Sequence, residues 1–251
     1  MQLKDKVIIL TGASSGIGAA AARLFSARGA RLVIGARRKA RLDALAGELA
    51  AAGGEVVTVA GDVVDDAHAR ALVEAAVSRF GRLDGAFNNA GIVGDMVPLP
   101  QMSPETWNRV LEVNLTSAFH LARHQIPAML ANGGKGSIVF TSTFVGHGVG
   151  LPGMAAYAAA KSGLIGLTQV LAAEHGPAGL RVNALLPGGT MTEMAPSDAG
   201  ALKWIAGLHA LKRIAEPEEI AAAAAFLLSD DASFVTGSAM FADGGNSICK
   251  T

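Results

Sequence analysis

The sequence predicts a doubly wound α/β fold, in which a parallel sheet of about seven strands carries helices on both faces. Short runs of β-branched and aliphatic residues alternate with longer alanine-rich segments whose apolar residues recur at helical spacing. The chain has 251 residues, a length that α/β folds reach as one unit. No internal repeat, low-complexity linker or change of composition marks a second domain, so we expect a single domain over residues 1–251.

Seven segments are predicted as strands because they are short, apolar and bounded by turn residues. They cover residues 7–11, 31–35, 55–60, 83–87, 137–142, 180–186 and 238–241. Since they alternate with segments of helical length, we expect parallel pairing and right-handed crossovers.

The segments between the strands are predicted as helices from their periodicity and their end signals. Glycines end the first two helices, and Ser103 with Pro104 supplies an N-cap and a first-turn proline for a long helical stretch. The predicted helices cover residues 16–29, 39–52, 66–80, 103–130, 155–174 and 217–228, with one more inside a loop over 188–211.

Composition restricts the classes of partner and compartment. The chain has 21 basic and 21 acidic residues, so its zero net charge gives no electrostatic reason to expect nucleic acid or an anionic membrane as a partner. The single cysteine, Cys249, excludes an internal disulfide framework and fits a reducing compartment. We find no apolar run typical of a signal peptide or membrane span, and therefore expect a cytoplasmic protein.

A glycine-rich turn, Thr-Gly-Ala-Ser-Ser-Gly-Ile-Gly at residues 11–18, follows the first predicted strand. Glycines permit a tight turn and let backbone amides approach a pyrophosphate, while the helix N-terminus adds partial positive charge. A plain glycine-rich turn is the alternative. The spacing Gly-x-x-x-Gly-x-Gly favours a dinucleotide phosphate site formed by Gly12, Ser14, Ser15, Gly16, Ile17 and Gly18.

The end of the second predicted strand indicates which dinucleotide this would be. An acid that would bind a free ribose 2′-hydroxyl is missing there, since Ala36 stands at that position and Arg37 and Arg38 follow. Guanidinium groups can hold a 2′-phosphate through charge-assisted hydrogen bonds. The sequence therefore favours NADP(H), with NAD(H) possible and a solvated basic helix start as the alternative.

Tyr157 and Lys161 lie four residues apart on one face of a predicted helix, and Tyr157 is the only tyrosine in the chain. An adjacent ammonium group favours the phenolate and lowers the pKa of a tyrosine from its reference value near 10. General acid–base chemistry requires a pKa nearer neutrality. The pair is thus a candidate catalytic centre, with an amphipathic surface pair as the alternative.

With these motifs in place, the chain resembles the short-chain dehydrogenase/reductase family over essentially its whole length. The resemblance is to the short branch of the family that includes 3-oxoacyl-carrier-protein reductases. It implies a Rossmann fold and hydride transfer between a nicotinamide and a carbonyl or secondary alcohol, with Tyr157 as general acid or base. The residues that carry it are Gly12, Gly16, Gly18, Asp62, Asn88, Asn89, Ala90, Gly91, Asn114, Thr141, Ser142, Thr143, Tyr157, Lys161, Pro187 and Gly188.

The resemblance also implies roles for single residues. Lys161 would lower the pKa of Tyr157 and hold the nicotinamide ribose, and Asn114 would lie at a helix distortion and anchor a water molecule. The implied cofactor contacts are Asp62 and Val63 at the adenine, Asn89, Ala90 and Gly91 at the riboses, Pro187, Gly188, Thr190 and Thr192 at the nicotinamide, and Tyr157 and Lys161.

The catalytic hydroxyl departs from the family pattern. The family's serine usually lies 13 residues before the tyrosine, where this chain has Phe144. Alignment on residues 143–146 points to Thr143, whereas Ser142 matches the usual residue type. Neighbouring strand positions point to opposite faces of a sheet. The sequence leaves open which of the two hydroxyls fills the catalytic role.

Residues 188–215 are predicted to form a substrate lid, with Met191, Met194, Trp204 and Leu208 lining an apolar pocket. His209, close to that lid, fits a solvated loop histidine better than a substrate contact. We expect no metal site at His120 and His124, because no accompanying carboxylate–histidine pattern is present.

The resemblance and the small residues around Tyr157 also imply a homotetramer, with a dimer left open. The substrate is a small molecule that the sequence does not specify. An NAD-dependent diol or sugar dehydrogenase and a non-catalytic NADP(H)-binding regulator are the alternative functions.

Overall fold

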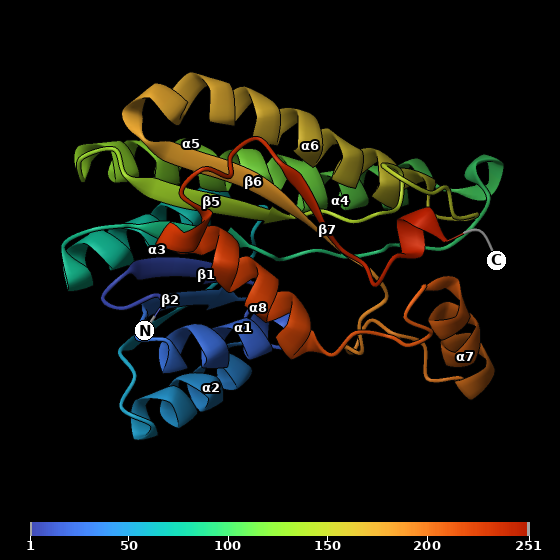
Figure 1. Cartoon of the computed structure of the whole chain (residues 1–251), viewed down its shortest axis with the longest axis horizontal. Helices are drawn as coiled ribbons and strands as arrows, with labels where there is room; N and C mark the ends of the chain where they lie inside the picture. Colours follow the sequence, from blue (N-terminus) through green and yellow to red (C-terminus); the bar gives the residue numbers. More distant parts are fainter. Residues whose placement is uncertain (1, 250–251) are drawn as a thin grey trace.

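Seven parallel strands form one sheet in the computed structural model, which describes residues 2–249 (Figure 1). The strand order is β3-β2-β1-β4-β5-β6-β7. Their bounds are β1 Val7–Thr11, β2 Arg31–Ala36, β3 Val56–Ala60, β4 Gly85–Asn88, β5 Gly136–Thr141, β6 Leu180–Pro187 and β7 Ala239–Ala242. Because β1 pairs with β2 on one side and β4 on the other, the winding direction reverses between β1 and β4. The predicted doubly wound parallel sheet is confirmed.

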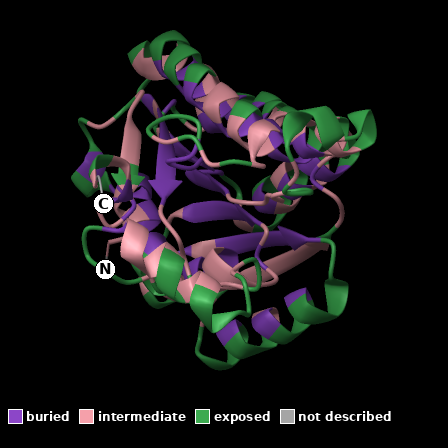
Figure 2. Ribbon diagram, turned by 90° about the vertical axis from the view of Figure 1, so that its right-hand side faces the viewer, coloured by how far each residue is buried: buried purple, intermediate pink, exposed green. Residues whose placement is uncertain are grey.

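Helices cover both faces of this sheet. α1 (Gly16–Ala27), α2 (Lys39–Ala51) and α8 (Pro217–Leu228) pack on one face, and α3 (Asp66–Phe80), α5 (Ser117–Ala131) and α6 (Ala155–His175) pack on the other. Ile8 and Leu10 of β1 belong to the first core, whereas Val7 and Ile9 belong to the second. A central strand with two covered faces must be apolar throughout. Figure 2 shows the buried strands between helices whose exposed sides face outward.

The long helical stretch predicted over residues 103–130 consists of two α-helices joined by a π-helical turn. α4 covers Pro104–Leu111 and begins at Ser103, whose hydroxyl accepts the Thr106 N–H at 3.0 Å. The π turn covers Glu112–Thr116 and contains Asn114, which is buried. Such turns insert an extra residue into a helix and often occur at functional sites.

The other predicted elements agree with the structure to within two residues at each end, which is the ordinary uncertainty of helix and strand boundaries. Short 3₁₀ helices cover Leu99–Gln101, Gly176–Ala178, Asp230–Ala232 and Asn246–Ile248. α7 (Ala199–Leu208) has no buried residue and stands apart from the helix layers at the lower right of Figure 1. Among the described helices, none combines the length and apolar character that crossing a membrane requires.

Candidate active site

The glycine turn after β1 and the loop after β4 meet at the carboxyl ends of two neighbouring strands. The Thr11 hydroxyl accepts the backbone N–H groups of Asn89 at 3.1 Å and Ala90 at 3.3 Å, and Asn89 Nδ2 donates to the Thr11 carbonyl at 3.3 Å. This is the place where the strand order reverses, and where open α/β sheets bind their ligands. The structure therefore brings together the predicted residues Gly12, Asn89, Ala90 and the start of α1.

The glycine turn is shaped to admit a phosphate group. Gly12 and Gly16 have φ values of +71° and +51°, and a Cβ on Gly18 would lie 2.1 Å from the carbonyl oxygen of Gly12. α1 begins at Ser15 without a side-chain cap and without an acidic residue in its first turn. Its first N–H groups and its positive dipole end are thus available to an anion, which fits a dinucleotide pyrophosphate. Ile17 and Gly18 lie in this first turn.

The two arginines after β2 point to different places. Arg38 donates to the Ser14 hydroxyl at 3.0 Å and to the Ser15 hydroxyl at 2.6 Å. Arg37 instead lies 4.0 Å from Asp62 Oδ2. The cations predicted to act together are therefore divided between the glycine turn and the loop after β3.

Asp62 is held by a residue that the sequence did not single out. Arg109 of α4 donates to Asp62 Oδ2 at 2.9 Å. Burial alone would raise the pKa of Asp62, but the hydrogen bond from Arg109 and the charges of Arg109 and Arg37 hold it below its usual value. Val63 beside it is buried. No local signal could have identified Arg109, because it lies 47 residues further along the chain.

Asn114 connects the π turn to the loop after β4. Its Nδ2 donates to the carbonyls of Ile92 at 2.8 Å and Val110 at 2.9 Å, and its Oδ1 accepts the Ile92 N–H at 3.1 Å. A Cβ on Gly91 would lie 2.7 Å from Asn114 Oδ1 and 3.2 Å from Lys161 Nζ. Glycine at that position thus lets the loop pass beside both side chains.

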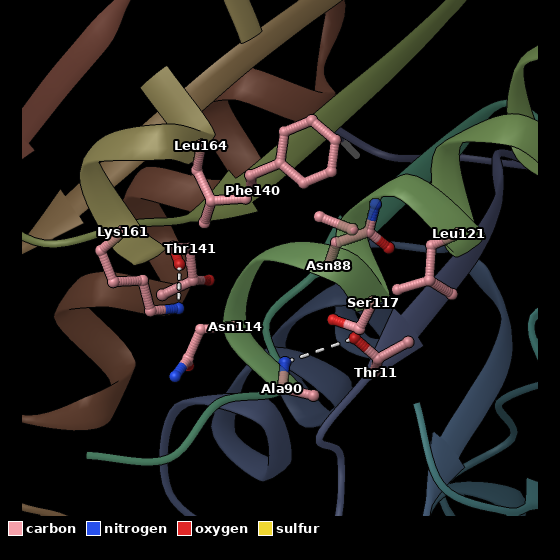
Figure 3. Close-up of a pocket in the computed structure, with 11 residues that line it drawn as sticks. Thr11, Asn88, Ala90, Asn114, Ser117, Leu121, Phe140, Thr141, Lys161 and Leu164 are labelled. Atoms are coloured by element: carbon pink, nitrogen blue, oxygen red, sulfur yellow. Dashed lines mark hydrogen bonds between the residues drawn. The ribbon is translucent and has the colours of Figure 1, made fainter. Parts of the chain in front are cut away.

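A small cavity with both polar and apolar lining residues lies behind this loop (Figure 3). The space open to the centre of a water molecule is about 10 Å³, which is room for about one water molecule. Its lining includes Thr11, Asn88, Asn114, Ser117, Thr141 and Lys161. The water anchored by Asn114 stays a prediction, and this cavity offers it a place.

Lys161 and Tyr157 lie on α6 beside the end of β5. The Lys161 ammonium is buried, donates to the Thr141 carbonyl at 2.6 Å and lies 5.8 Å from the centre of the Tyr157 ring. Thr143 is close enough to Tyr157 for its side chain to lower the pKa of the phenol, whereas the Ser142 hydroxyl donates to the Lys161 carbonyl at 2.7 Å. Of the two hydroxyls that the sequence left open, Thr143 therefore faces the phenol.

Burial governs the ionisation of this pair. It raises the pKa of Tyr157 to about 12, against the opposing effect of the Thr143 side chain, and lowers the pKa of Lys161 to about 7. The expected lowering of the Tyr157 pKa is thus not found, because burial raises that pKa and the Lys161 ammonium donates to the Thr141 carbonyl instead. A phenol with this pKa is protonated at neutral pH and can donate a proton.

The loop after β6 is fixed by a buried histidine. His209 Nε2 accepts the Gly189 N–H at 3.0 Å, so Nδ1 carries the ring proton and donates to the Ile205 carbonyl at 2.8 Å. The expectation that His209 is a solvated loop residue is wrong, because it is 2% exposed. It ties the last turn of α7 to the loop that contains Gly188 and Thr190.

The segment from β6 to α7 crosses the glycine turn. Pro187 ends β6, the Thr190 hydroxyl donates to the Gly188 carbonyl at 3.0 Å, and Thr192 Cγ2 lies 3.0 Å from where a Cβ on Gly16 would stand. Glu193, which the sequence did not single out, forms ion pairs with Arg38 and Arg41 at the start of α2.

The predicted lid residues Met191, Met194 and Trp204 are exposed, by 42%, 56% and 60%, and Leu208 is half-buried. Their contact with substrate stays a prediction.

His120 and His124 both face one carboxylate oxygen of Asp66, at 3.3 and 3.0 Å. Over residues 2–249 the structure has no group of three or more histidine, cysteine, aspartate or glutamate side chains arranged to hold a metal ion.

The family model described as enoyl-(acyl carrier protein) reductase matches residues 12–247. A 2,5-dichloro-2,5-cyclohexadiene-1,4-diol dehydrogenase of Sphingobium indicum is 43% identical over 249 residues, which are 97% of each chain. A cyclohexanol dehydrogenase of an Acinetobacter species is 39% identical over 245 residues, which are 97% of this chain and 95% of the relative.

Among solved structures, carveol dehydrogenase from Mycobacterium avium in complex with NAD superimposes with a TM-score of 0.94. It is 28% identical and 99% of each chain is covered. The single-domain fold, the family match and these relatives agree with one another. The chain therefore belongs to the short-chain dehydrogenase/reductase family of NAD(P)-dependent oxidoreductases, which act on CH–OH and C=O groups.

Proposed function

We propose that this chain interconverts a cyclic secondary alcohol and its ketone with NADP(H). The observation that carries the proposal is the arrangement of Tyr157, Thr143 and Lys161 at the carboxyl end of β5. In the reductive direction, Tyr157 donates its proton to the carbonyl oxygen while the Thr143 hydroxyl donates a hydrogen bond to that oxygen. In the oxidative direction the phenolate takes the alcohol proton. The nicotinamide, when bound, supplies or accepts the hydride.

The remaining site residues position and feed this centre. In this proposal Lys161 holds the nicotinamide ribose and restores the proton of Tyr157, and the cavity beside it has room for one water molecule. Asn114 fixes the loop that carries Asn89 and Gly91. In this proposal that loop borders the cofactor. Gly12, Gly16 and Gly18 admit the pyrophosphate to the N–H groups of α1.

The proposed substrate class rests on two observations. The exposed side chains of the lid segment, Met191, Met194 and Trp204, are apolar and suit an apolar substrate. Two relatives that match nearly the whole chain are named for cyclohexanol and a cyclohexadiene diol. A panel of cyclohexanone, a cyclohexanediol, a sugar and a 3-oxoacyl thioester tests this class. We expect the highest kcat/KM for the cyclic compounds, and turnover of the thioester alone would refute the proposed class.

The NADP(H) preference is supported by the end of β2. Ala36 offers no carboxylate to a ribose 2′-hydroxyl, and Arg38 lies against the Ser14 and Ser15 hydroxyls at the edge of the glycine turn. Fluorescence titration with NADPH and NADH tests it. We expect tighter binding of NADPH and a loss of about tenfold in Arg38→Ala, with a smaller loss in Arg37→Ala.

The second candidate, an NAD-dependent diol dehydrogenase, is favoured by the carveol dehydrogenase structure, which contains NAD. Tighter binding of NADH than of NADPH in the same titration would decide for it. A chain that bound either nucleotide but turned over none of the panel would instead support the non-catalytic regulator.

A homotetramer is proposed as the assembly. Phe119 of α5 and Val170 of α6 are each about half exposed on the outer side of one helix layer, and apolar side chains in such positions suit a contact between copies. Light scattering after size-exclusion chromatography tests this assembly, and a monomer at micromolar concentration would refute it.

A further inference from the structure

We propose that Glu193 competes with the 2′-phosphate of the cofactor for one cation site, and so limits the preference of this chain for NADP(H) over NAD(H). The proposal rests on the assignment of Arg38 to the 2′-phosphate under the proposed function. It adds a specificity-determining residue that lies outside the strand–turn–helix unit where the cofactor preference was predicted.

The carboxylate of Glu193 occupies a site built for an anion. Its Oε2 accepts from Arg38 Nη1 at 2.9 Å, and its Oε1 accepts from Arg41 Nη1. Arg38 is the N-cap residue of α2 and Arg41 follows in the first turn, so both cations lie at the positive end of one helix. That first turn has no acidic residue and no side-chain cap. The balancing anion therefore comes from a segment 155 residues further along the chain.

This site overlaps the place that the proposed function assigns to a 2′-phosphate. The Arg38 guanidinium that binds Glu193 also donates to Ser14 at 3.1 and 3.0 Å and to Ser15 at 2.6 Å. A guanidinium has five N–H donors, and the contacts with Ser14, Ser15 and Glu193 engage four of those of Arg38. A phosphate can therefore form a bidentate contact with Arg38 only by replacing one of its partners. Like charges repel, so the partner that a phosphate replaces is Glu193.

The competition also connects the cofactor to the lid. Thr192 packs against Gly16 of the glycine turn, and Glu193 follows it directly, so this part of the 188–215 segment is held at α1 and α2 together. A 2′-phosphate that displaces Glu193 releases the segment from α2. A nucleotide without that phosphate leaves the ion pairs in place.

The expected change in affinity for a 2′-phosphate follows from how exposed the three charged side chains are. The side chains of Arg38, Arg41 and Glu193 are each about half exposed, at 43%, 50% and 56%, so each ion pair contributes little and salt weakens it. Removal of the competing carboxylate should raise affinity for a 2′-phosphate about three- to tenfold at low ionic strength.

Calorimetric titration with 2′,5′-ADP and 5′-AMP tests the proposal without turnover. The proteins are the full chain, Glu193→Gln, Arg38→Ala and the control Glu105→Gln, an exposed glutamate in the first turn of α4. We expect Glu193→Gln to bind 2′,5′-ADP about three- to tenfold tighter with 5′-AMP unchanged, and Glu105→Gln to behave like the wild type. Hydrogen exchange of residues 191–208 should rise with 2′,5′-ADP and not with 5′-AMP.

The outcomes separate this proposal from the one on which it rests. If the wild type prefers 2′,5′-ADP and Arg38→Ala loses the preference while Glu193→Gln leaves it unchanged or reduces it, the competition is refuted and the NADP(H) assignment stands. If the wild type has no preference but Glu193→Gln acquires one, the competition is supported and the NADP(H) assignment is refuted. If neither the wild type nor Glu193→Gln shows a preference, both proposals are refuted.

Discussion

Replacement of Lys161 by methionine should change how the stability of this protein depends on pH. The ammonium is buried at the active site, and burial lowers its pKa from 10.5 to about 7. The difference corresponds to about 5 kcal/mol of unfavourable desolvation when the group is charged, as an upper bound. Methionine keeps most of the length of the side chain and has no charge to bury.

Proton linkage gives the sign of the pH dependence of the free energy of unfolding. Because the pKa is lower in the folded chain, the unfolded chain binds more protons between about pH 7 and 10.5, and the free energy of unfolding of the wild type rises with pH there. The gain is fully present above the unfolded pKa and is lost as the pH falls to 7. The slope is at most about 1.4 kcal/mol per pH unit, so about 2 kcal/mol should appear between pH 7.5 and 9.5. Tyr157 opposes this trend only above pH 10, where its own unfolded form ionises.

Urea unfolding at a series of pH values measures this slope. The difference between the wild type and Lys161→Met should change by about 2 kcal/mol across the interval, on top of a constant offset for the lost hydrogen bond to Thr141. Lys203→Met, at an exposed position of α7, should leave the slope of the wild type unchanged. A difference between wild type and Lys161→Met that is independent of pH would refute the reasoning.

Three further substitutions test single contacts of the site. Thr143→Val should lower kcat about 100-fold, whereas Ser142→Ala should lower the free energy of unfolding by about 1 kcal/mol and nearly spare kcat; the reverse pattern in steady-state kinetics would reassign the hydroxyl. Gly18→Ala would place a Cβ 2.1 Å from the Gly12 carbonyl oxygen, so nucleotide binding should be lost in a fluorescence titration, and retained affinity would contradict the shape of the turn. Asn114→Leu removes three hydrogen bonds to backbone groups and should reduce stability in urea by about 2 to 4 kcal/mol, and an unchanged midpoint would contradict this role.

Local signals were sufficient for the fold. Spacing, caps and glycines within each segment predicted the strands, the helices and the glycine turn, whereas the order of the strands came from the structure. The π turn around Asn114 was indicated only by the family resemblance, because its sequence has ordinary helical character.

The missed parts of the site depend on contacts between distant segments. Glu193 meets Arg41 across 152 residues, and Arg109 meets Asp62 across 47. The choice between Thr143 and Ser142 depends on side-chain direction at the end of β5, which alternation alone could not decide. The pKa of Tyr157 depends on burial and on where Lys161 places its hydrogen bond, and neither can be read from their spacing of four residues.

The most direct test of the proposed chemistry is a single-turnover measurement on Tyr157→Phe. This change removes one hydroxyl and keeps the ring, so NADPH affinity, measured by fluorescence titration, should stay within about twofold. The rate of NADPH oxidation with cyclohexanone should fall at least about 100-fold, because the proton donor is gone. A variant that binds NADPH and reduces the ketone at the wild-type rate would contradict the assignment of Tyr157 as the catalytic acid.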